Sequence, residues 1–414
     1  MKVLFIEKNH TFVLVKLNVF AMISPQENVY FDNAASTPLL PQVVEQMAEV
    51  LHKYYGNPSS THSYGRSAKT LIEKARRTIA KIINAQPSEI IFTSGGTEAN
   101  NMILRGCARD LKIQTIISAQ TEHHAVLHTL DSLSQEYGIT IRHVNLTPEG
   151  DADLQHLQSL LETHQKEKVL VSLMHVNNEI GNILDLQQVC KICHNYGALF
   201  HSDTVQSVGH FPLDMQQISA DFITASAHKF HGPKGVGFAF IRKNIPLKGF
   251  ILGGEQERGI RAGTEALHDI IGLETAFTLA YNELDVRNEQ ILTIKKYFIK
   301  RLSEQFSAIT FNGQSGDLQK SSPTILNVRL PFSANTLLFH LDIQGIACSK
   351  GSACQSGSVQ DSHVLTAFLP TEALRKASLR FSFSHLNTLQ QVDYVIEKLV
   401  EIIHQEKNNF LLPN

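Results

Sequence analysis

Short apolar runs alternate with amphipathic segments in the first two thirds of the chain. Seven such runs lie between Ile90 and Arg242, and the segments between most of them carry apolar residues at helical spacing. Because strands that alternate with helices favour a mostly parallel sheet covered on both faces, this region predicts an α/β layer. The runs KVLVSLMHV (168–176) and ALFHSD (198–203) are nearly continuous in apolar residues, so we expect them to form central strands.

The pattern changes in the last third of the chain. Helical periodicity without proline runs from Thr264 to about Phe306 and predicts one long helix that bridges two domains. Beyond it the order strand, helix, loop, helix, strand, helix is typical of a smaller α+β unit. We therefore predict a large domain over 29–275 and a small domain over 276–414, with the segment near 29–40 packed close to the small one.

Composition narrows the class of protein. The chain has 414 residues with 37 Lys+Arg and 39 Asp+Glu, and this charge balance gives no reason to expect a nucleic-acid partner. Five cysteines in so long a chain argue against an extracellular disulfide framework and favour the cytoplasm. The longest apolar stretch, Thr11–Ile23, is interrupted by Lys16 and Asn18, so we expect no membrane span.

The first 28 residues have no clear place in this scheme. An acidic and a basic residue interrupt the apolar pattern early, as a secretory signal would not, and the segment lacks the arginines of a mitochondrial presequence. We expect a loosely packed arm, or a start codon assigned too early, and treat residues 1–28 as dispensable.

The string IIFTSGGTEANN points to an anion site. A predicted buried strand leads through Ser94 and Gly95 into Gly96 and Thr97, where a helix begins. The backbone N–H groups at a helix start bind anions, and Thr97 adds a hydroxyl, so a phosphate would fit there. The string matches neither standard phosphate-loop pattern, and glycines at such a turn also serve turn geometry alone.

Two further residues suggest which phosphate compound is bound. Asp203 ends a predicted central strand, and Lys229 follows the next one in SAHKFHGPKG. Ligands of open α/β sheets bind at the carboxyl ends of strands. Pyridoxal phosphate needs both groups, since a lysine forms the Schiff base and a carboxylate keeps the pyridine nitrogen protonated. Taken singly, Asp203 could be a helix cap and Lys229 a surface residue, so the prediction rests on their combination.

His123, Cys354 and Arg380 are the remaining candidates for chemistry. His123 follows a predicted strand, where an imidazole could stack on a ring or move a proton. Metal binding by His123 with its histidine neighbours is disfavoured, because no third ligand at a recognised spacing accompanies them. Cys354 lies in a Gly/Ser-rich stretch suited to a nucleophile that moves to and from a site. The guanidinium of Arg380 suits a carboxylate, although a structural ion pair is equally compatible.

One string points to a different class of protein. Cys190, Cys193 and His194 match the C-x-x-C-H pattern of haem attachment. The surrounding LQQVCKICHNYG has the apolar spacing of a helix packed on a sheet, and such attachment occurs on exported chains. A haem- or metal-binding protein therefore stays as a disfavoured alternative.

The chain closely resembles the cysteine desulfurases of the NifS/IscS kind, pyridoxal-phosphate enzymes of aminotransferase class V. The resemblance covers residues 29 to about 400. It is carried by VYFDNAAST, GNPSSTHSYGR, IFTSGGTEANN, TEHHAVL, SLMHVNNEIG, HSDTVQSVG, SAHKFHGPKG, GGEQERGIRAGT, GSACQSGS and LRFSFS. It implies an α/β fold of the aspartate-aminotransferase-like type (fold type I), with a mostly parallel seven-stranded sheet in the large domain and a smaller α+β domain.

The resemblance also implies a role for individual residues. Lys229 would form the Schiff base, Cys354 would accept the sulfur, and His123 would stack on the cofactor ring. The other implied cofactor contacts are Gly96, Thr97, Ser226 and His228 to the phosphate, Asp203 to the pyridine nitrogen, Asn178 and Gln206 to the ring hydroxyl, and Thr264 from the second subunit of a homodimer. The implied contacts of the substrate carboxylate are Arg380, Asn178 and Asn33.

The implied reaction removes sulfur from L-cysteine and leaves L-alanine and a Cys354 persulfide. The persulfide would supply an iron-sulfur scaffold or another sulfur acceptor, for cluster assembly, transfer-RNA thiolation or both. The long stretch around Cys354 resembles the group that feeds iron-sulfur scaffolds. No intrinsic metal is expected, and Cys354 would meet a cluster only during transfer. A selenocysteine lyase or another class V enzyme, which would use Lys229 and Asp203 without Cys354, stays open.

Overall fold

The protein is built around a seven-stranded sheet. The computed structural model describes residues 4–8, 11–15, 28–334, 336–351 and 362–410. The sheet has the order β4-β10-β9-β8-β7-β5-β6, and its strands are parallel except β10, which is antiparallel to both neighbours. The strands are β4 (Ile90–Thr93), β5 (Thr115–Ser118), β6 (Thr140–His143), β7 (Val169–Ser172), β8 (Leu199–Asp203), β9 (Phe222–Ser226) and β10 (Gly237–Ile241). The predicted α/β sheet is confirmed, with the runs 168–176 and 198–203 at its centre as β7 and β8.

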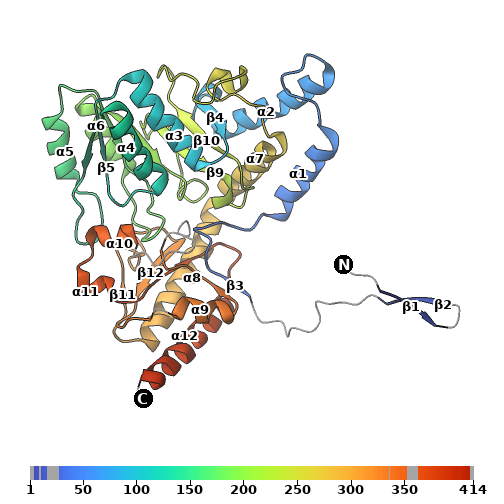
Figure 1. The fold of residues 1–414 in the computed structure, drawn as a ribbon, viewed down its shortest axis with the longest axis vertical. Coiled ribbons are helices and arrows are strands. Elements are labelled where there is room, and N and C mark those ends of the chain that lie inside the picture. Colours follow the sequence, from blue (N-terminus) through green and yellow to red (C-terminus); the bar gives the residue numbers. More distant parts are fainter. Residues whose placement is uncertain (1–3, 9–10, 16–27, 335, 352–361, 411–414) are drawn as a thin grey trace.

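Helices cover both faces of this sheet (Figure 1). One core contains α3 (Gly96–Gly106) and α4 (His124–Tyr137). The opposite core contains α1 (Pro41–Lys53), α2 (Ser63–Ile82), α5 (Leu154–Thr163), α6 (Leu186–Asn195) and α7 (Leu267–Asn282). Successive residues of a strand enter opposite cores: Leu170 joins the first and Val171 the second. Because both faces are covered, the central strands need apolar residues at nearly every position.

The prediction of one continuous helix from Thr264 to about Phe306 is wrong, because the helix is interrupted. It is two helices, α7 and α8 (Leu284–Gln305), separated by Glu283, whose φ of −114° and ψ of 16° are not helical. The apolar residues of α7 pack against the large sheet, whereas Ile291 and Phe298 of α8 enter a separate core. The break at Glu283 therefore separates the helix that packs in the core of the large sheet from the helix that packs in the second core. The Glu283 carboxylate pairs with Arg287 one turn later.

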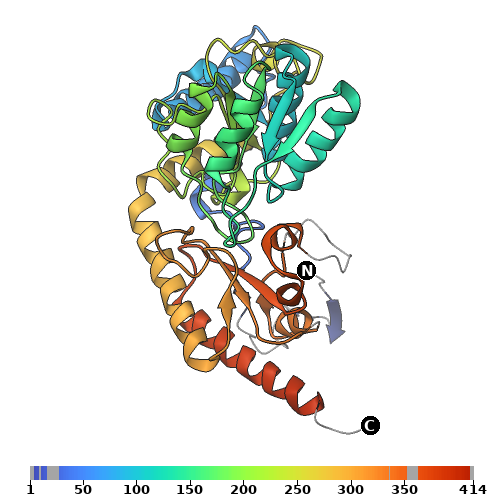
Figure 2. The same cartoon turned by 90° about the vertical axis from the view of Figure 1, so that its left-hand side faces the viewer.

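A smaller C-terminal lobe follows the break (Figure 2). Its antiparallel sheet has the order β11-β12-β14. The elements are β11 (Thr310–Phe311), β12 (Ile325–Arg329), α9 (Leu337–Ile343), β13 (Ile346–Ala347), α10 (His363–Phe368), α11 (Thr371–Leu374), β14 (Ser378–Ser382) and α12 (Leu389–Phe410). Two of these, β11 and β13, are too short for the apolar pattern to reveal, and the sequence missed them along with α10.

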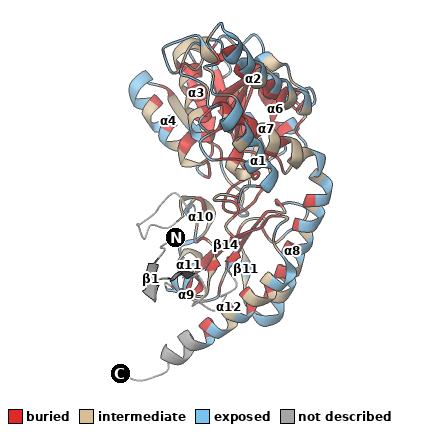
Figure 3. Cartoon of the chain, turned by 90° about the vertical axis from the view of Figure 1, so that its right-hand side faces the viewer, coloured by how far each residue is buried: buried red, intermediate tan, exposed pale blue. Residues whose placement is uncertain are grey.

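The segment after residue 28 belongs to this C-terminal lobe. β3 (Val29–Tyr30) pairs in parallel with β13, and Phe31 packs edge-to-face on Phe298 and Phe383. Buried residues accordingly gather in the strands and on the inward helix faces of both lobes (Figure 3). The chain therefore crosses from one lobe to the other near residues 32–40 and again near Glu283, while the predicted boundary after residue 275 stays a prediction.

The N-terminal residues contain secondary structure that the sequence did not predict. β1 (Leu4–Lys8) and β2 (Thr11–Val15) form an antiparallel hairpin, which lies apart from both lobes in Figure 1. In the described part of the chain, no helix is both long enough and apolar enough to cross a membrane.

Candidate active site

A cavity lies where the large sheet meets the C-terminal lobe. Ten of the thirteen residues predicted for the site line it: Gly96, Thr97, His123, Asn178, Asp203, Gln206, Ser226, His228, Lys229 and Arg380. The other lining residues are Ala34, Ala35, Asn100, Met174 and Val205. Most come from the carboxyl ends of strands and the loops after them, where ligands of open α/β sheets bind.

One end of the cavity is built for an anion. Gly95 follows β4 with a φ of +148°, a conformation that favours glycine, and α3 begins at Gly96. A Cβ at Gly96 would come within 2.5 Å of Val205 Cγ2, so only glycine lets α3 approach the loop after β8 this closely. The first N–H groups of a helix lack intrahelical partners, and Thr97, Ser226 and His228 line the same cavity.

Asp203 is held rigidly at the end of β8. Its side chain is buried, Oδ2 accepts a hydrogen bond from Asn100 Nδ2 at 2.7 Å, and Oδ1 accepts from the backbone N–H of Val205 at 2.9 Å. The sequence missed Asn100, although it lies one helical turn after Gly96, an amide among the apolar residues with which α3 faces the sheet. These bonds orient the carboxylate without neutralising it.

Lys229 is held by backbone oxygens of a segment near the start of the chain. Its Nζ donates to Ala34 O at 2.5 Å and to Ala35 O at 2.9 Å, and Gln206 Nε2 donates to Ala34 O at 2.9 Å. The Ala34 N–H in turn donates to Ser382 Oγ of β14 at 2.8 Å. The segment 34–35 therefore connects the lysine of the large sheet to the C-terminal lobe.

His123 caps α4 beside the cavity. Its Nδ1 accepts the Ala125 N–H at 3.1 Å, so a neutral ring carries its proton on Nε2. Burial lowers the pKa of His123, which favours this neutral form. His124 stacks on His128 with centroids 4.7 Å apart and lies 4.3 Å from His363. Among the residues described, no three His, Cys, Asp or Glu side chains are placed to hold a metal ion.

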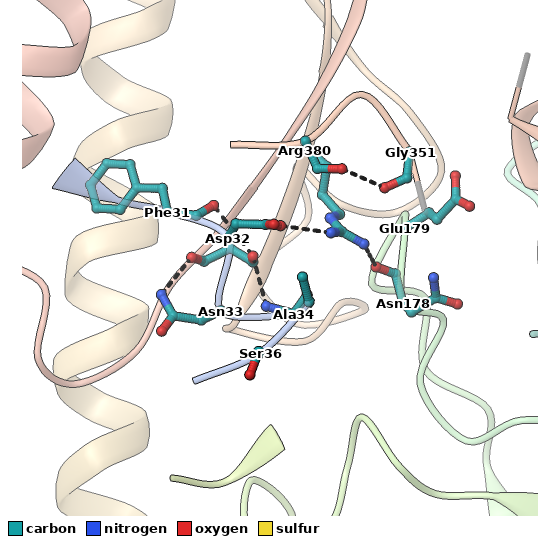
Figure 4. Close-up of polar contacts among 12 residues, drawn as sticks. Phe31, Asp32, Asn33, Ala34, Ser36, Asn178, Glu179, Gly351 and Arg380 are labelled. Carbon is teal, nitrogen blue, oxygen red and sulfur yellow. Dashed lines mark hydrogen bonds and ion pairs between the residues drawn. The ribbon is translucent and has the colours of Figure 1, made fainter. Parts of the chain in front are cut away.

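Arg380 projects from β14 and lines the cavity from the C-terminal lobe. Its buried guanidinium donates from Nη1 to Asn178 O at 2.8 Å and pairs through Nη2 with Asp32 Oδ1 at 2.7 Å (Figure 4). Neither Arg380 Nε nor Asn178 Oδ1 has a hydrogen-bond partner among the described residues. A buried donor and a buried acceptor at one cavity therefore call for a polar ligand.

Three predicted site residues are not placed in the cavity. Asn33 does not line it, because its Nδ2 donates to Ser382 O at 2.9 Å and to Asn387 Oδ1 at 3.2 Å, so it fastens the segment to the C-terminal lobe. Thr264 lies in an exposed segment before α7 and does not line the cavity. Cys354 lies outside the described residues.

The haem alternative meets an obstacle in α6. Cys190 and Cys193 lie in the hydrophobic core, whereas His194 is exposed and its Nε2 lies 3.5 Å from Asp221. Burial raises the pKa of Cys190 to about 12 and also raises that of Cys193. The string CKICH is thus used for packing, as its apolar spacing indicated.

Comparisons with known proteins identify the family of the chain. The family model described as aminotransferase class-V matches residues 29–395. A protein of Dictyoglomus turgidum named cysteine desulfurase IscS is 40% identical over 385 residues, which cover 92% of this chain and 95% of that one. The putative cysteine desulfurase IscS 1 of Bacillus subtilis is 38% identical, covering 91% and 99%. A solved structure titled NifS-like protein superposes with a TM-score of 0.84 at 34% identity, covering 91% of this chain and all of that chain.

Proposed function

Since the chain belongs to the class-V aminotransferases and is a cysteine desulfurase, we propose that its cavity binds pyridoxal phosphate and L-cysteine and delivers the sulfur to Cys354. The observation that carries this proposal is the convergence of Asp203, Lys229 and Arg380 on one cavity. The carboxylate and the amine match the pyridine nitrogen and the aldehyde of the cofactor. The guanidinium matches the carboxylate of an amino-acid substrate.

The residues present fit the cofactor. Thr97, Ser226, His228 and the N-terminus of α3 would hold the phosphate, because they line one cavity and the first N–H groups of a helix lack intrahelical partners. Asp203 would pair with the pyridine nitrogen. Asn178, whose Oδ1 lacks a described partner, and Gln206 would contact the ring hydroxyl, and His123 would stack on the ring. When bound, pyridoxal phosphate supplies the electron sink that acidifies the α-carbon and accommodates the electron pair of the broken C–S bond.

The chain's own groups then have separate tasks. Lys229 Nζ, held by the carbonyls of Ala34 and Ala35, is the amine that attaches the cofactor and then takes the α-proton of the substrate. Arg380 binds the substrate carboxylate through N–H groups that Asn178 and Asp32 leave available. Asp203, oriented by Asn100, stays ready to stabilise a protonated pyridine nitrogen.

The sulfur step needs one further group, which we assign to Cys354. Its thiolate forms an S–S bond with the substrate sulfur while the C–S bond breaks, and the carbon that leaves is protonated. The balance is enzyme thiol plus L-cysteine giving enzyme persulfide plus L-alanine, with no external oxidant. The persulfide then passes to an iron-sulfur scaffold or another acceptor.

The direct test measures sulfide and alanine from L-cysteine and a thiol reductant, with the holoenzyme. We expect equimolar products from wild type, loss of both in steady turnover by Cys354→Ala, and little change in Cys348→Ala, the matched thiol control. Turnover that survives in Cys354→Ala would instead favour a lyase or another class V reaction that does not use a cysteine nucleophile. Absence of products from a cofactor-loaded wild type would overturn the substrate assignment.

We also propose that the enzyme is a homodimer in which Thr264 serves the neighbouring subunit's cavity. This proposal is supported by apolar side chains that the single chain leaves exposed on the large-sheet lobe: Leu51, Tyr55, Tyr64 and Leu252. Lys229→Ala and Thr264→Arg homodimers should each be inactive. Mixing and reassembling them should restore about a quarter of wild-type activity, because one site of each mixed dimer has both residues. No recovery in verified mixed dimers would place Thr264 in its own subunit's site.

A further inference from the structure

The residues assigned to the cofactor phosphate supply hydrogen bonds but no full positive charge. Thr97 and Ser226 carry neutral hydroxyls, and Gly96 opens the helix whose first N–H groups face outward. Burial lowers the pKa of His228 to about 4, so its ring is neutral at neutral pH. A phosphate monoester carries about −1.5 to −2 charges there, against about half a positive charge at a helix N-terminus. These four residues therefore have no positive charge to spare for a second anion beside the phosphate.

Glu98 places such an anion in the first turn of α3. It follows Thr97 directly, and its Oε2 accepts the Ser94 N–H at 2.9 Å, so the carboxylate reaches back over the turn that leads into the helix. Burial raises the pKa of Glu98, but the hydrogen bonds from Arg261 and Ser94 outweigh it and lower the pKa, so the group is ionised. A bare carboxylate at this end of the helix would compete with a phosphate for the same N–H groups and repel it.

Arg261 pairs with this carboxylate from a separate segment of the chain. Its Nε donates to Glu98 Oε1 at 2.8 Å, and its Nη2 donates to Oε2 at 3.3 Å. The side chains of Arg261 and Glu98 are 23% and 11% exposed, so solvent screens the pair only in part. The backbone beside Arg261 is fixed, because the Ala262 N–H donates to Ile251 O at 3.0 Å. The guanidinium is thus held against the first turn of α3.

Glu98 is the main partner of Arg261 among the described carboxylates around it. Glu98 raises the pKa of Arg261 most, and Glu257 and Glu265 raise it less. Glu257 already has a partner, since it accepts hydrogen bonds of 2.6 and 2.7 Å from Arg76. Burial raises the pKa of Glu265, which favours its neutral form. The charge that Arg261 compensates is therefore chiefly the one beside the phosphate-binding turn.

We propose that Arg261 is a positioning residue for the cofactor phosphate: by pairing with Glu98, it cancels the negative charge in the first turn of α3 and leaves that turn available to an anion. This inference rests on the proposed function. Loss of the guanidinium should weaken the contacts of the phosphate, whereas Asp203 and Lys229 keep their own partners and their contacts with the pyridine ring and the aldehyde. The effect should therefore fall on the phosphate alone.

The experiment measures the dissociation constants of pyridoxal phosphate and of pyridoxal, which lacks the phosphate, by absorbance titration of the full chain freed of cofactor. Wild type is compared with Arg261→Gln, Arg261→Lys, Glu98→Gln and the double variant that combines Glu98→Gln with Arg261→Gln. Arg258→Gln is the matched control, because Arg258 is exposed in the same segment and donates to Pro87 O. The ratio of the two constants isolates the contribution of the phosphate.

We expect Arg261→Gln to weaken binding of pyridoxal phosphate about tenfold and to leave pyridoxal within about twofold of wild type. Arg261→Lys keeps the charge and should retain most of the affinity, as should the Arg258→Gln control. The double variant should regain the affinity for pyridoxal phosphate, since it has no carboxylate to compensate. If Arg261 only held the segment that carries Thr264, the double variant would stay as weak as Arg261→Gln. That result would overturn the inference, as would equal weakening of both ligands.

Glu98→Gln decides the question if Arg261→Gln does not fold. This variant should bind pyridoxal phosphate at least as tightly as wild type, because glutamine can still accept the Ser94 N–H but carries no charge. Weaker binding of pyridoxal phosphate with unchanged binding of pyridoxal would overturn the inference. A wild type that binds both ligands equally would refute the phosphate site of the proposed function itself.

Discussion

Replacing Arg380 with lysine should weaken recognition of the substrate carboxylate without removing the positive charge. Arg380 is buried, and two of its five N–H groups are used by Asn178 O and Asp32 Oδ1. The remaining donors include Nε, which has no described partner, and allow two parallel bonds to a carboxylate. A lysine keeps the charge but loses one of these bonds, at a cost of about 1.5–3 kcal/mol. Affinity should therefore fall about 10- to 100-fold.

The assay isolates the carboxylate by comparing two ligands. L-Alanine carries it and L-alaninamide does not, and neither has a thiol that reacts further. Their dissociation constants are measured from the cofactor absorbance of wild type, Arg380→Lys and the control Arg375→Lys, an exposed arginine of the same lobe. The first variant should lose most of the preference for L-alanine, and the control should retain it. Equal weakening of both ligands by Arg380→Lys would refute the reasoning and reduce Arg380 to a structural partner of Asp32.

Three further predictions concern the frame of the site. Glu257→Gln should destabilise the protein by about 3–5 kcal/mol in thermal unfolding, because Arg76 and Glu257 form a buried pair with bonds of 2.6 and 2.7 Å; an unchanged midpoint would contradict this. Asn100→Ala should lower cofactor affinity about tenfold in an absorbance titration through lost orientation of Asp203, and wild-type affinity would exclude that role. Burial lowers the pKa of Lys295 to about 7, so the folded state binds fewer protons than the unfolded chain between pH 7 and 10, and stability should rise with pH across that window. Lys295→Met should flatten this rise, measured as the denaturant midpoint against pH, and a slope that persists would assign it to other groups.

The large sheet and the reactive residue types of the site could be predicted because each depends on a short stretch of sequence. Strands such as 168–176 need apolar residues on two faces. Asp203 ends β8 and Lys229 comes shortly after β9, so each lies at the carboxyl end of its strand wherever its neighbours pack. The helix from Thr264 to Phe306 shows where local reasoning stops. Its periodicity is continuous, but the two cores it serves lie in different lobes, and the break at Glu283 leaves no sign in the apolar pattern.

Asn33 and Glu179 illustrate the same limit at the site. Asn33 follows Asp32 in a motif that belongs to the site, yet its amide faces Ser382 and Asn387, hundreds of residues away in the chain. Glu179 carries no local signal of its long-range contact, because Ser362 reaches its carboxylate from the C-terminal lobe. Pattern analysis detects which residue types are unusual for their element, and neither residue is unusual in that sense.

The sequence by itself determined the strands of the large sheet and most of the reactive side chains, since burial and backbone preference act over a few neighbouring residues. Only the tertiary structure decided which of those side chains share a cavity. Arg380 meets Asp32 across 348 positions, and Lys229 is held by the carbonyl of Ala34 across 195. Backbone oxygens are the same in every residue, so contacts of this kind exist only after the two lobes have packed around their separate cores.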